Sequence, residues 1–502
     1  MDNRAAYTEL EARFRRHGVL QGAAGLLGWD SQTMMPSGGA DNRAEQSAAL
    51  ALVCHELLTD PAVSDLLDGA ETNEAVALDD WQTANLAEMR RRWVHANALD
   101  GPLVEALTKA TMASEMYWRE ARPANDFDGF AGHLETVLGL VREVAAAKAA
   151  ALDCSPYDAL LDEFEPHGKS ADIDVLFARL TAFLPGFLGR VMEHQAGQPP
   201  ILDPEGPFAV DDQRALGLRM MTAAGFDFDH GRLDVSDHPF TGGAPDDVRI
   251  TTRYHEEDFT RSLMAVMHET GHAMYERGLP AEWRYQPIGE SAGMSLHESQ
   301  SLLLEMQACR SRAFIDFAAP LMRDAFGGSG PAWEADNLYR LYTRVTPGLI
   351  RVDADEVTYP AHIMLRYRLE TALVADNLAV ADLPGAWNDG MAELLGITPP
   401  DDRDGCLQDI HWAAGAFGYF PTYTMGALTA AQVYAAARQA DGDIEVGLGR
   451  GDFTPLFRWL GTNIHGRGAS LTPTALLTRA TGKPLDAAVF EAHLEARYLA
   501  QG

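Results

Sequence analysis

Hydrophobic positions recur at helical spacing along most of the chain. Apolar side chains follow one another three or four residues apart in several segments, including Leu10, Phe14 and Leu20; Leu134, Val137, Leu140 and Val141; and Leu302, Leu303 and Met306. Alanine-rich stretches at 144–152 and 427–437 add residues of high intrinsic helix propensity. The pattern therefore predicts a mainly α-helical protein.

Strand and turn signals are few. The clearest predicted strand is 248–254, VRITTRY, in which β-branched residues alternate with polar ones. Turn-forming residues cluster at 36–39, 197–204, 239–245 and 327–331. None of these clusters is long enough to be a flexible linker, and no repeat recurs at a fixed period. We predict one large unit over residues 1–502, with two lobes around a groove and a helical region at about 1–120 forming part of one groove wall.

Composition and charge exclude several classes of protein. The 502 residues are 46% hydrophobic, which is enough for a large core. Acidic residues outnumber basic ones by 73 to 40, and the formal charge of -33 would repel phosphate backbones and anionic lipid headgroups. Nucleic acid is therefore not expected as a partner. A charged surface that keeps the protein soluble explains the same excess, so charge alone names no substrate.

Cysteine usage and the N-terminus indicate a cytoplasmic protein. The four cysteines, Cys54, Cys154, Cys309 and Cys406, are far apart and form no CxxC pair. They suggest neither a disulfide framework nor a thiolate zinc site. Residues 1–20 are charged and lack the apolar core of a signal peptide, and no uninterrupted apolar run approaches the length of a bilayer. No membrane partner is expected.

One predicted helix carries a metal-binding pattern. The segment 259–278, FTRSLMAVMHETGHAMYERG, follows an acidic run and closes with a glycine, as helices do. Residues four apart share a helix face, so His268 and His272 can converge on one cation, while Glu269 lies beside it and can activate a water. Buried histidines that merely satisfy each other in a core are the alternative, but two imidazoles on an apolar face need partners. The pattern predicts a zinc-dependent hydrolase.

The third ligand has to come from elsewhere in the chain, because catalytic zinc usually takes three protein ligands and leaves one position open. Glu298 is the best candidate. It lies three residues after Ser295, so a capping box that opens a helix is the alternative role for the same glutamate. Glu305 could orient a ligand histidine, although an ordinary surface glutamate fits the pattern equally well.

Ordered motifs along the chain resemble those of the thermostable carboxypeptidase (carboxypeptidase Taq) family of zinc metallocarboxypeptidases. Segments 27–36 and 459–468 are similar to its terminal regions, and between them the blocks run in order as His238-Pro-Phe240, Asp247-Val-Arg249-Ile-Thr251, His268 to His272, His297-Glu-Ser-Gln300, Ile350-Arg-Val-Asp-Ala-Asp355 and Gly405-Cys-Leu-Gln-Asp-Ile-His-Trp412. The resemblance covers nearly the whole chain. It implies a helical two-lobed fold with a deep groove, a small β-sheet beside the metal helix, and a homodimer.

The resemblance also implies a function and a ligand set. The expected reaction is removal of single C-terminal residues of broad identity from peptides, and Glu298 becomes the third ligand rather than a cap. The expected cofactor is one Zn²⁺ per chain, although Co²⁺ or Mn²⁺ could occupy the same ligands. Glu269 is expected to act as general base.

Candidate residues for the transition state and for the substrate carboxylate lie further along the chain. His411 and Tyr423 are the expected donors to the oxyanion, although a stretch so aromatic is also typical of core packing. Arg351 is the first candidate to bind the free carboxylate and Arg249 the second. An ion pair between Arg351 and Asp353 or Asp355, and a solvent-facing position for Arg249, are the alternatives.

Two further expectations concern the groove. The strand that carries Arg249 could bind an extended peptide by adding it to the edge of a sheet. His238 could line the same groove, although a histidine before a proline in a loop is usually structural.

Three other functions compete with this interpretation. An endo-acting oligopeptidase would share the metal ligands and Glu269 but leave the groove open at both ends, and Arg351 and Arg249 argue against it. A scaffold protein without turnover would have no need for Glu269. An aminopeptidase would need acidic groups for the substrate's amine, and no glycine- and methionine-rich anchor pattern precedes the metal helix.

Overall fold

Helices make up most of the chain, as the spacing of apolar residues predicts. The structure is a computed structural model, and it describes residues 3–71 and 78–499. By their contacts these residues divide into two compact units: Met1–Ala96, Pro200–Thr343 and Thr429–Leu485 form the first, and Asn97–Pro199, Arg344–Leu428 and Asp486–Gly502 form the second. The predicted N-terminal region over about 1–120 therefore divides between the units after Ala96. A single catalytic domain over 1–502 remains a prediction.

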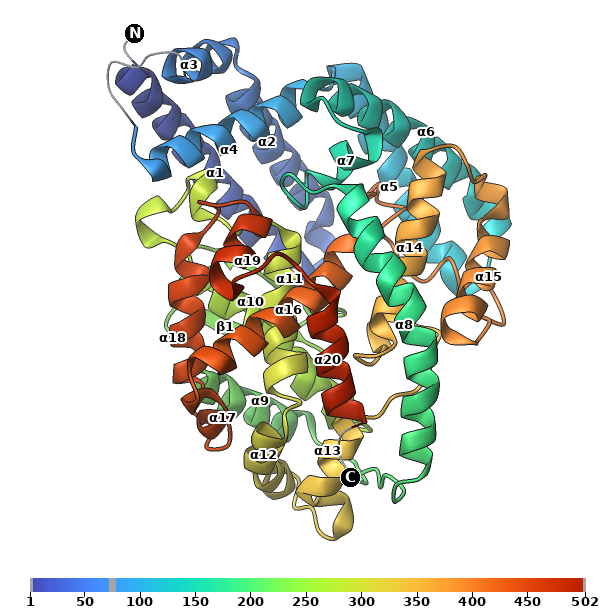
Figure 1. Ribbon diagram of the computed structural model, residues 1–502. Coiled ribbons are helices and arrows are strands. Elements are labelled where there is room, and N and C mark those ends of the chain that lie inside the picture. The colour runs from blue at the N-terminus through green and yellow to red at the C-terminus, as the bar shows by residue number, and fades with distance from the viewer. Residues whose placement is uncertain (1–2, 72–77, 500–502) are drawn as a thin grey trace. The chain divides into compact units, whose positions relative to one another are not determined.

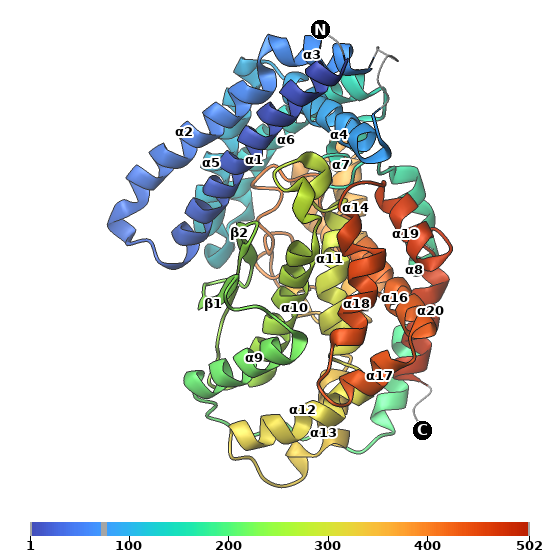
Figure 2. The ribbon, with the colours of Figure 1, turned by 90° about the vertical axis from the view of Figure 1, so that its left-hand side faces the viewer.

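The first unit contains the N-terminal helices and the only sheet in the described residues (Figures 1 and 2). A core of apolar side chains from α1, α3 and α4 includes Leu10 and Phe14, as predicted. The elements are α1 Asn3–Thr33, α2 Ala40–Thr59, α3 Pro61–Glu71, α4 Asp80–Asn97, α9 Val210–Ala224, β1 Gly231–Val235, β2 Thr241–Ala244, β3 Asp247–Thr252, α10 Phe259–Gly278, α11 Met294–Leu302, α12 Arg312–Ala325, α13 Ala335–Tyr342, α17 Asp443–Leu448, α18 Thr454–Asn463 and α19 Pro473–Thr481, with most of α16 Pro421–Ala440.

The small sheet lies against the helix that carries the HExxH pattern. Its strand order is β1-β3-β2, with β1 parallel and β2 antiparallel to β3. Apolar residues of β1 and β3 pack with those of α9 and α10, and α10 also contacts α11 (Figure 2). The strand predicted at 248–254 is confirmed as β3, which begins at Asp247 and ends at Thr252. Because β3 is the central strand and pairs on both sides, the expectation that it binds a peptide by edge addition is wrong.

Strand β2 lies where the sequence indicated only a turn, at 239–245. Its two glycines carry no signal of strand propensity, and Gly243 has a φ of 112° that favours glycine. A Cβ at Gly243 would lie 2.1 Å from the carbonyl oxygen of Asp247. The strand therefore forms because the chain doubles back tightly onto β3, a contact that propensity cannot predict.

The second unit consists of helices. Its longest helices include α5 and α6, which lie side by side (Figure 1). The predicted apolar positions Leu134, Val137 and Val141 are buried in α6. The elements are α5 Gly101–Ala124, α6 Phe127–Leu152, α7 Pro156–Leu161, α8 Ser170–Ala196, α14 Tyr359–Val374, α15 Leu383–Leu395 and α20 Ala487–Tyr498, together with the start of α16.

Helix α8 is the one described helix whose length and apolar composition would suffice to cross a membrane. The core helix of a soluble protein passes the same test. Helix α8 contacts α14, α15 and α20, and its apolar residues Leu180, Phe187 and Val191 are buried. Its hydrophobic face therefore has protein neighbours within the second unit.

The C-terminal helix α20 holds the segment that follows Arg351. Glu356 is buried and accepts hydrogen bonds from Arg497 at 3.0 Å and from the Tyr498 hydroxyl at 3.0 Å, and it lies 2.9 Å from His493 Nε2. A buried carboxylate is costly unless it is paired and hydrogen-bonded, and these three side chains meet that need.

Removing the charge of Glu356 is expected to destabilise the protein. In Glu356→Gln, the largely buried side chain of Arg497 loses its ion pair with the Glu356 carboxylate, and breaking such a pair costs about 3–5 kcal/mol of the free energy of unfolding. Urea denaturation would measure the loss. The matched control is Glu491→Gln on the same helix, which breaks a pair with the half-exposed Arg179. It should cost far less, and equal losses would contradict the assignment.

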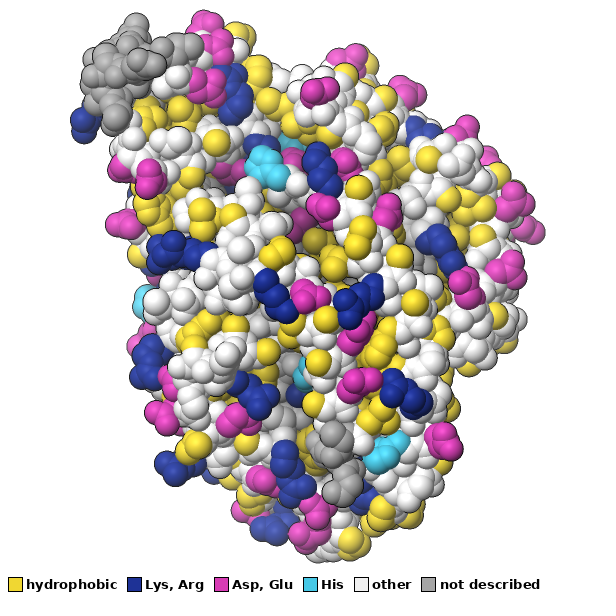
Figure 3. Space-filling model, in the orientation of Figure 1, with side chains coloured by type: hydrophobic (Ala, Val, Ile, Leu, Met, Phe, Trp, Pro, Cys, Tyr) yellow, Lys and Arg dark blue, Asp and Glu magenta, His cyan; other side chains and the backbone are white. Residues whose placement is uncertain are grey.

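On the face that Figure 3 shows, charged side chains of both signs lie among one another. Figure 3 shows acidic and basic side chains interspersed with polar and apolar ones on the face in view. No large field of a single sign is therefore visible on this face.

Candidate active site

Helix α10 is confirmed over the residues that the sequence indicated, Phe259–Gly278. The Asp258 side chain caps it by accepting a hydrogen bond from the Thr260 N–H at 2.9 Å. One face is apolar and buried through residues such as Leu263 and Met267, whereas His268 and His272 remain partly accessible. The helix therefore presents both imidazoles from one face, as a spacing of four residues requires.

A close helix contact brings Glu298 to those histidines. A Cβ at Gly271, in the middle of HETGH, would lie 2.5 Å from the Gln300 carbonyl oxygen and 2.6 Å from the Ser301 Cα. Only glycine allows α11 to approach α10 this closely. The alternative role for Glu298, a capping box with Ser295, is not what the structure shows: α11 begins at Met294 with Gly293 as its N-cap, which has no side-chain cap hydrogen bond. Glu298 is thus not held as a helix cap.

His268, His272 and Glu298 converge on one point. One ligand atom from each residue lies within 4.8 Å of the others, and they are the one such group of three in the described chain. The Nε2 atoms of His268 and His272 lie 3.9 and 3.6 Å from the two carboxylate oxygens of Glu298. Two imidazole nitrogens and one carboxylate form a donor set that fits catalytic zinc and leaves a coordination position open.

The surroundings of His268 favour a cation. Burial disfavours a charged imidazole, but the hydrogen bond to Glu305 and the charges of Glu298 and Glu269 raise the pKa of His268 to about 10. The same carboxylates would stabilise a metal ion, which competes with the proton for the ring nitrogen. Burial and the neighbouring imidazoles of His297 and His268 instead lower the pKa of His272 well below its usual value.

Glu305 orients the His268 ring. Its Oε2 lies 2.9 Å from His268 Nδ1, so the Nε2 of that ring faces Glu298, and its other oxygen accepts a hydrogen bond from Arg310 at 2.6 Å. Glu305 lies in a π-helical segment, Leu303–Ala308, that follows α11 directly. Such segments often occur at functional sites because they change the direction of side chains along a helix. Partners of this kind set the tautomer and orientation of a metal-binding histidine.

Glu269 lies next to the ligand cluster and is held by the sheet. The Thr241 hydroxyl, from β2, lies 2.6 Å from Glu269 Oε2 and 3.1 Å from the Glu269 carbonyl oxygen. Burial raises the pKa of Glu269, which the charge of His268 and the hydrogen bond from Thr241 oppose. A carboxylate of raised pKa beside a metal site can take up and release a proton.

Arg249 and His238, which the sequence also predicted, lie in the first unit, as do His268, His272 and Glu298. Arg249 donates to both oxygens of Asp247, at 2.8 and 2.5 Å, and its guanidinium lies 4.6 Å from the centre of the Trp29 ring. It is partly buried rather than facing solvent, so the alternative of a free surface position is not what the structure shows. His238 lies in the loop between β1 and β2, where its side chain is exposed and its carbonyl accepts from Ser236.

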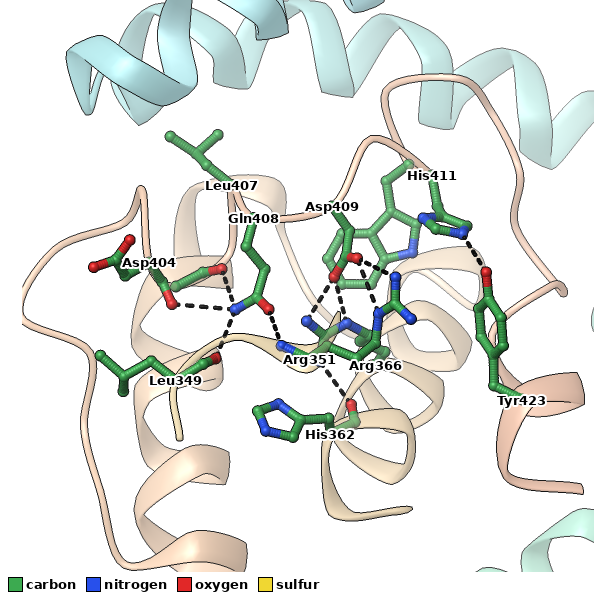
Figure 4. A network of polar contacts seen from close by, with 12 residues as sticks. Leu349, Arg351, His362, Arg366, Asp404, Leu407, Gln408, Asp409, His411 and Tyr423 are labelled. Atoms are coloured by element: carbon green, nitrogen blue, oxygen red, sulfur yellow. Dashed lines mark hydrogen bonds and ion pairs between the residues drawn. The ribbon is translucent and has the colours of Figure 1, made fainter. Parts of the chain in front are cut away.

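Arg351, in the second unit, pairs with neither Asp353 nor Asp355 but with Asp409 (Figure 4). Its Nε and Nη2 donate to one oxygen of Asp409 at 3.0 and 2.9 Å, and Arg366 donates to the other at 2.7 Å. Burial opposes the charge of Asp409, but the two arginines hold its pKa far below its usual value. Two cations share one carboxylate, so the group keeps a net positive charge.

His411 and Tyr423 lie together in the same network (Figure 4). The His411 Nε2 is 3.3 Å from the Tyr423 hydroxyl, and the Arg351 guanidinium lies 4.8 Å from the centre of the Tyr423 ring. Burial lowers the pKa of His411 to about 4; Asp409 opposes this shift and the two arginines add to it. A neutral imidazole carries one N–H, so an uncharged His411 can donate one hydrogen bond.

Comparison with known proteins decides the family. The model of the carboxypeptidase Taq (M32) metallopeptidases matches residues 9–498. The chain belongs to the M32 carboxypeptidase Taq family. It is accordingly an enzyme that hydrolyses peptide bonds, and membership of a metallopeptidase family implies a divalent metal ion. The M32 family supports carboxypeptidase activity, and the resemblance noted from the ordered motifs is confirmed.

M32 relatives match over nearly the full length of the chain. Thermostable carboxypeptidase 1 of Thermus thermophilus is 39% identical, covering 100% of this chain and 99% of its own. Among solved structures, Trypanosoma cruzi metallocarboxypeptidase 1 is 41% identical with a TM-score of 0.96 and 99% of each chain covered. The M32 carboxypeptidase of Deinococcus radiodurans R1 is 34% identical with a TM-score of 0.91, covering 98% of this chain and 99% of its own. The predicted mainly helical M32 fold is confirmed.

Some residues that contact the predicted ones were not themselves predicted from the sequence. Thr241 carries no local signal, because it lies in a segment that resembles a turn and contacts Glu269 only through the sheet. Asp409 stands two residues before His411 in the 405–412 motif, and this proximity could have marked it as a candidate residue. Arg366 could not be assigned, because a lone arginine in a helix is more often a surface residue.

Proposed function

We propose that this M32 enzyme is a zinc-dependent carboxypeptidase of broad specificity in which Glu269 is the general base. The observation that carries the proposal is the convergence of His268, His272 and Glu298, with Glu269 adjacent. These three residues would hold the zinc ion. When bound, zinc supplies Lewis-acid chemistry, because it lowers the pKa of a water and polarises a carbonyl.

Side chains of the protein would transfer the protons and stabilise the negative charge that develops in the transition state. Glu269, positioned by Thr241, takes a proton from the attacking water and later delivers it to the leaving amine. We assign to His411 and Tyr423 the hydrogen bonds to the oxyanion that develops on the scissile carbonyl. A neutral His411 can donate one such bond without bringing a further positive charge.

Arg351 would recognise the free carboxylate of the substrate. Its Nε and Nη2 bind Asp409, which leaves Nη1 outside that pair, and Arg366 adds a second positive charge to the group. Arg249 ranks second, because both oxygens of Asp247 already engage its guanidinium. His238, exposed in its loop, would contact the peptide upstream of the cleaved bond.

A set of unstructured peptides tests the function directly. Each peptide carries either a free or an amidated C-terminus, the protein is loaded with zinc, and products are followed by mass spectrometry. Free-ended peptides of different C-terminal residues should shorten one residue at a time, while amidated ones stay intact. Internal cleavage that ignores amidation would point instead to an endo-acting oligopeptidase, and no cleavage despite bound metal would point to a scaffold.

Arg351→Lys is expected to impair the use of free-ended peptides. Lysine keeps the charge but loses the planar fork, and the loss of a hydrogen bond to a charged group predicts a decrease in kcat/KM of about 10- to 100-fold. Steady-state kinetics on one peptide would measure it, with Arg249→Lys as the matched variant. A larger decrease for Arg249→Lys would reverse the order of the two arginines.

We also propose that the enzyme works in the cytoplasm. The four cysteines of the chain are free, and three of them are buried, which suits a reducing cytoplasm. We further propose a homodimer, as the family resemblance implies. Analytical ultracentrifugation of the full chain would test the dimer, and a sedimentation coefficient of a monomer at micromolar concentration would rule it out.

A further inference from the structure

A single face of α14 holds the segment that carries His411. Arg366 and Glu370 are four residues apart on this helix, so they share a face. Arg366 binds Asp409 at 2.7 Å, and Glu370 accepts a hydrogen bond from the Trp412 indole N–H at 3.1 Å. The two helix residues thus bracket His411, one contact lying two residues before it and the other one residue after it.

Glu370 also holds the far end of the segment. The backbone N–H of Gly418 donates to its carboxylate. Gly418 has a φ of 90°, and a Cβ there would lie 2.8 Å from the backbone nitrogen of Leu161 in α7. Both ends of the segment from Trp412 to Gly418 therefore bind the Glu370 carboxylate. At Gly418 the backbone also packs closely against α7.

The His411 ring depends on its neighbours for its orientation. A catalytic histidine is usually oriented by a hydrogen bond to its second ring nitrogen, but the Nδ1 of His411 is buried and has no such partner in the described residues. The ring instead packs on Phe420, with 4.4 Å between ring centres. Trp412 packs edge-on against Phe420 and Trp387, at 5.8 and 6.2 Å. The position of Trp412 therefore sets that of His411.

The burial of Glu370 carries a free-energy cost that packing alone does not explain. It is fully buried, and its hydrogen-bond donors, Tyr157, Trp412 and Gly418, are all neutral. Burial raises the pKa of Glu370 to about 7, and the three hydrogen bonds oppose that shift. A buried carboxylate without a cationic partner costs stability, so a role in the site explains it better than a role in the core.

We propose that Glu370 is a positioning residue for His411, acting through the indole N–H of Trp412 and the backbone N–H of Gly418. The inference rests on the proposed role of His411 as an oxyanion donor. Glu370 itself does not touch the substrate. Its effect should therefore appear in kcat, because an oxyanion donor matters in the transition state rather than in substrate binding.

Two matched variants separate positioning from packing. Trp412→Phe and Tyr157→Phe each remove one donor to the same carboxylate while keeping a ring in place. Trp412→Phe should lower kcat by about 10-fold, the effect of one hydrogen bond to a charged group, with KM nearly unchanged. Tyr157→Phe should lower Tm but leave kcat unchanged. Equal losses of kcat in both variants, or none in Trp412→Phe, would overturn the proposal.

Substitutions of Glu370 complete the test. Glu370→Gln keeps an acceptor for Trp412 and should retain most of kcat, whereas Glu370→Leu should lose at least as much as Trp412→Phe. The double variant Glu370→Leu with Trp412→Phe should lose no more kcat than Glu370→Leu alone, because both substitutions break the same hydrogen bond between Trp412 and Glu370. Additive losses would overturn the proposal. A wild-type enzyme that does not shorten free-ended peptides would instead refute the proposed function, whatever the variants do.

Discussion

Glu269→Gln is expected to lower kcat/KM for peptide hydrolysis by about 10²- to 10⁴-fold, the range that general acid–base catalysis contributes. Glutamine has nearly the shape of glutamate and can still accept the hydrogen bond from Thr241, so the fold should persist. It cannot take a proton from water at neutral pH. The zinc content, measured by elemental analysis, should equal that of the wild type, because Glu269 lies outside the ligand cluster.

Thr241 provides the control for this result. Thr241→Val removes the hydroxyl that binds Glu269 but leaves the base in place, so its loss of kcat should be smaller than that of Glu269→Gln. Thr241→Ser keeps the hydroxyl and should retain most of the wild-type activity. If Glu269→Gln retains more than about a tenth of wild-type activity, contrary to the contribution of a general base, then Glu269 does not act as that base.

Glu298→Gln is expected to abolish tight zinc binding, and hydrolysis with it. The substitution leaves two imidazoles and one neutral amide, and it removes the carboxylate whose oxygens lie 3.9 and 3.6 Å from the two ring nitrogens. Equilibrium dialysis against a chelator of known affinity would measure the loss. Because a ligand that binds only the folded state stabilises it, added zinc should also raise Tm in the wild type but not in this variant.

Glu305→Gln serves as the matched comparison, since it contacts His268 without belonging to the ligand cluster. Loss of such a partner lowers metal affinity by about 10- to 100-fold rather than eliminating it. The ranking of the two variants is therefore the informative result. If Glu298→Gln binds zinc as tightly as the wild type, Glu298 is not the third ligand.

The pairing of Arg351 changes how carboxylate recognition should be understood. An arginine considered from sequence alone was expected either to be free for substrate or to pair with a near neighbour. In the structure its partner is Asp409, which Arg366 shares. A buried carboxylate between two arginines fixes the guanidinium planes while leaving one positive charge uncompensated. Arg351 can therefore be both structurally paired and able to attract an anion.

Local rules predicted the metal helix and the main strand well. Helix α10 has the predicted bounds because the apolar spacing and the acidic cap at Asp258 act within a few residues of each other. The convergence of His268 and His272 follows from the helix repeat alone. Strand β3 was recognisable from its β-branched residues, and the ordered motifs were enough to indicate the family that comparison then confirmed.

Where the local rules failed, a distant contact had changed the outcome. Strand β2 formed in a segment rich in turn residues because β3 pairs with it. The capping box at Ser295, the alternative role for Glu298, does not form because α11 begins earlier and packs on α10 through Gly271. Peptide addition to β3 is excluded because both of its edges are occupied.

The sequence by itself determined the helical class, the metal helix with its two histidines and adjacent glutamate, and the family, because helix periodicity, capping and ordered motifs are properties of residues close together in the chain. Only the tertiary structure decided that Glu298 and Glu305 face His268, that Thr241 holds Glu269, and that Asp409 binds Arg351. Those contacts join residues far apart in sequence, and they exist because helices and strands pack closely enough to bring them within hydrogen-bonding distance.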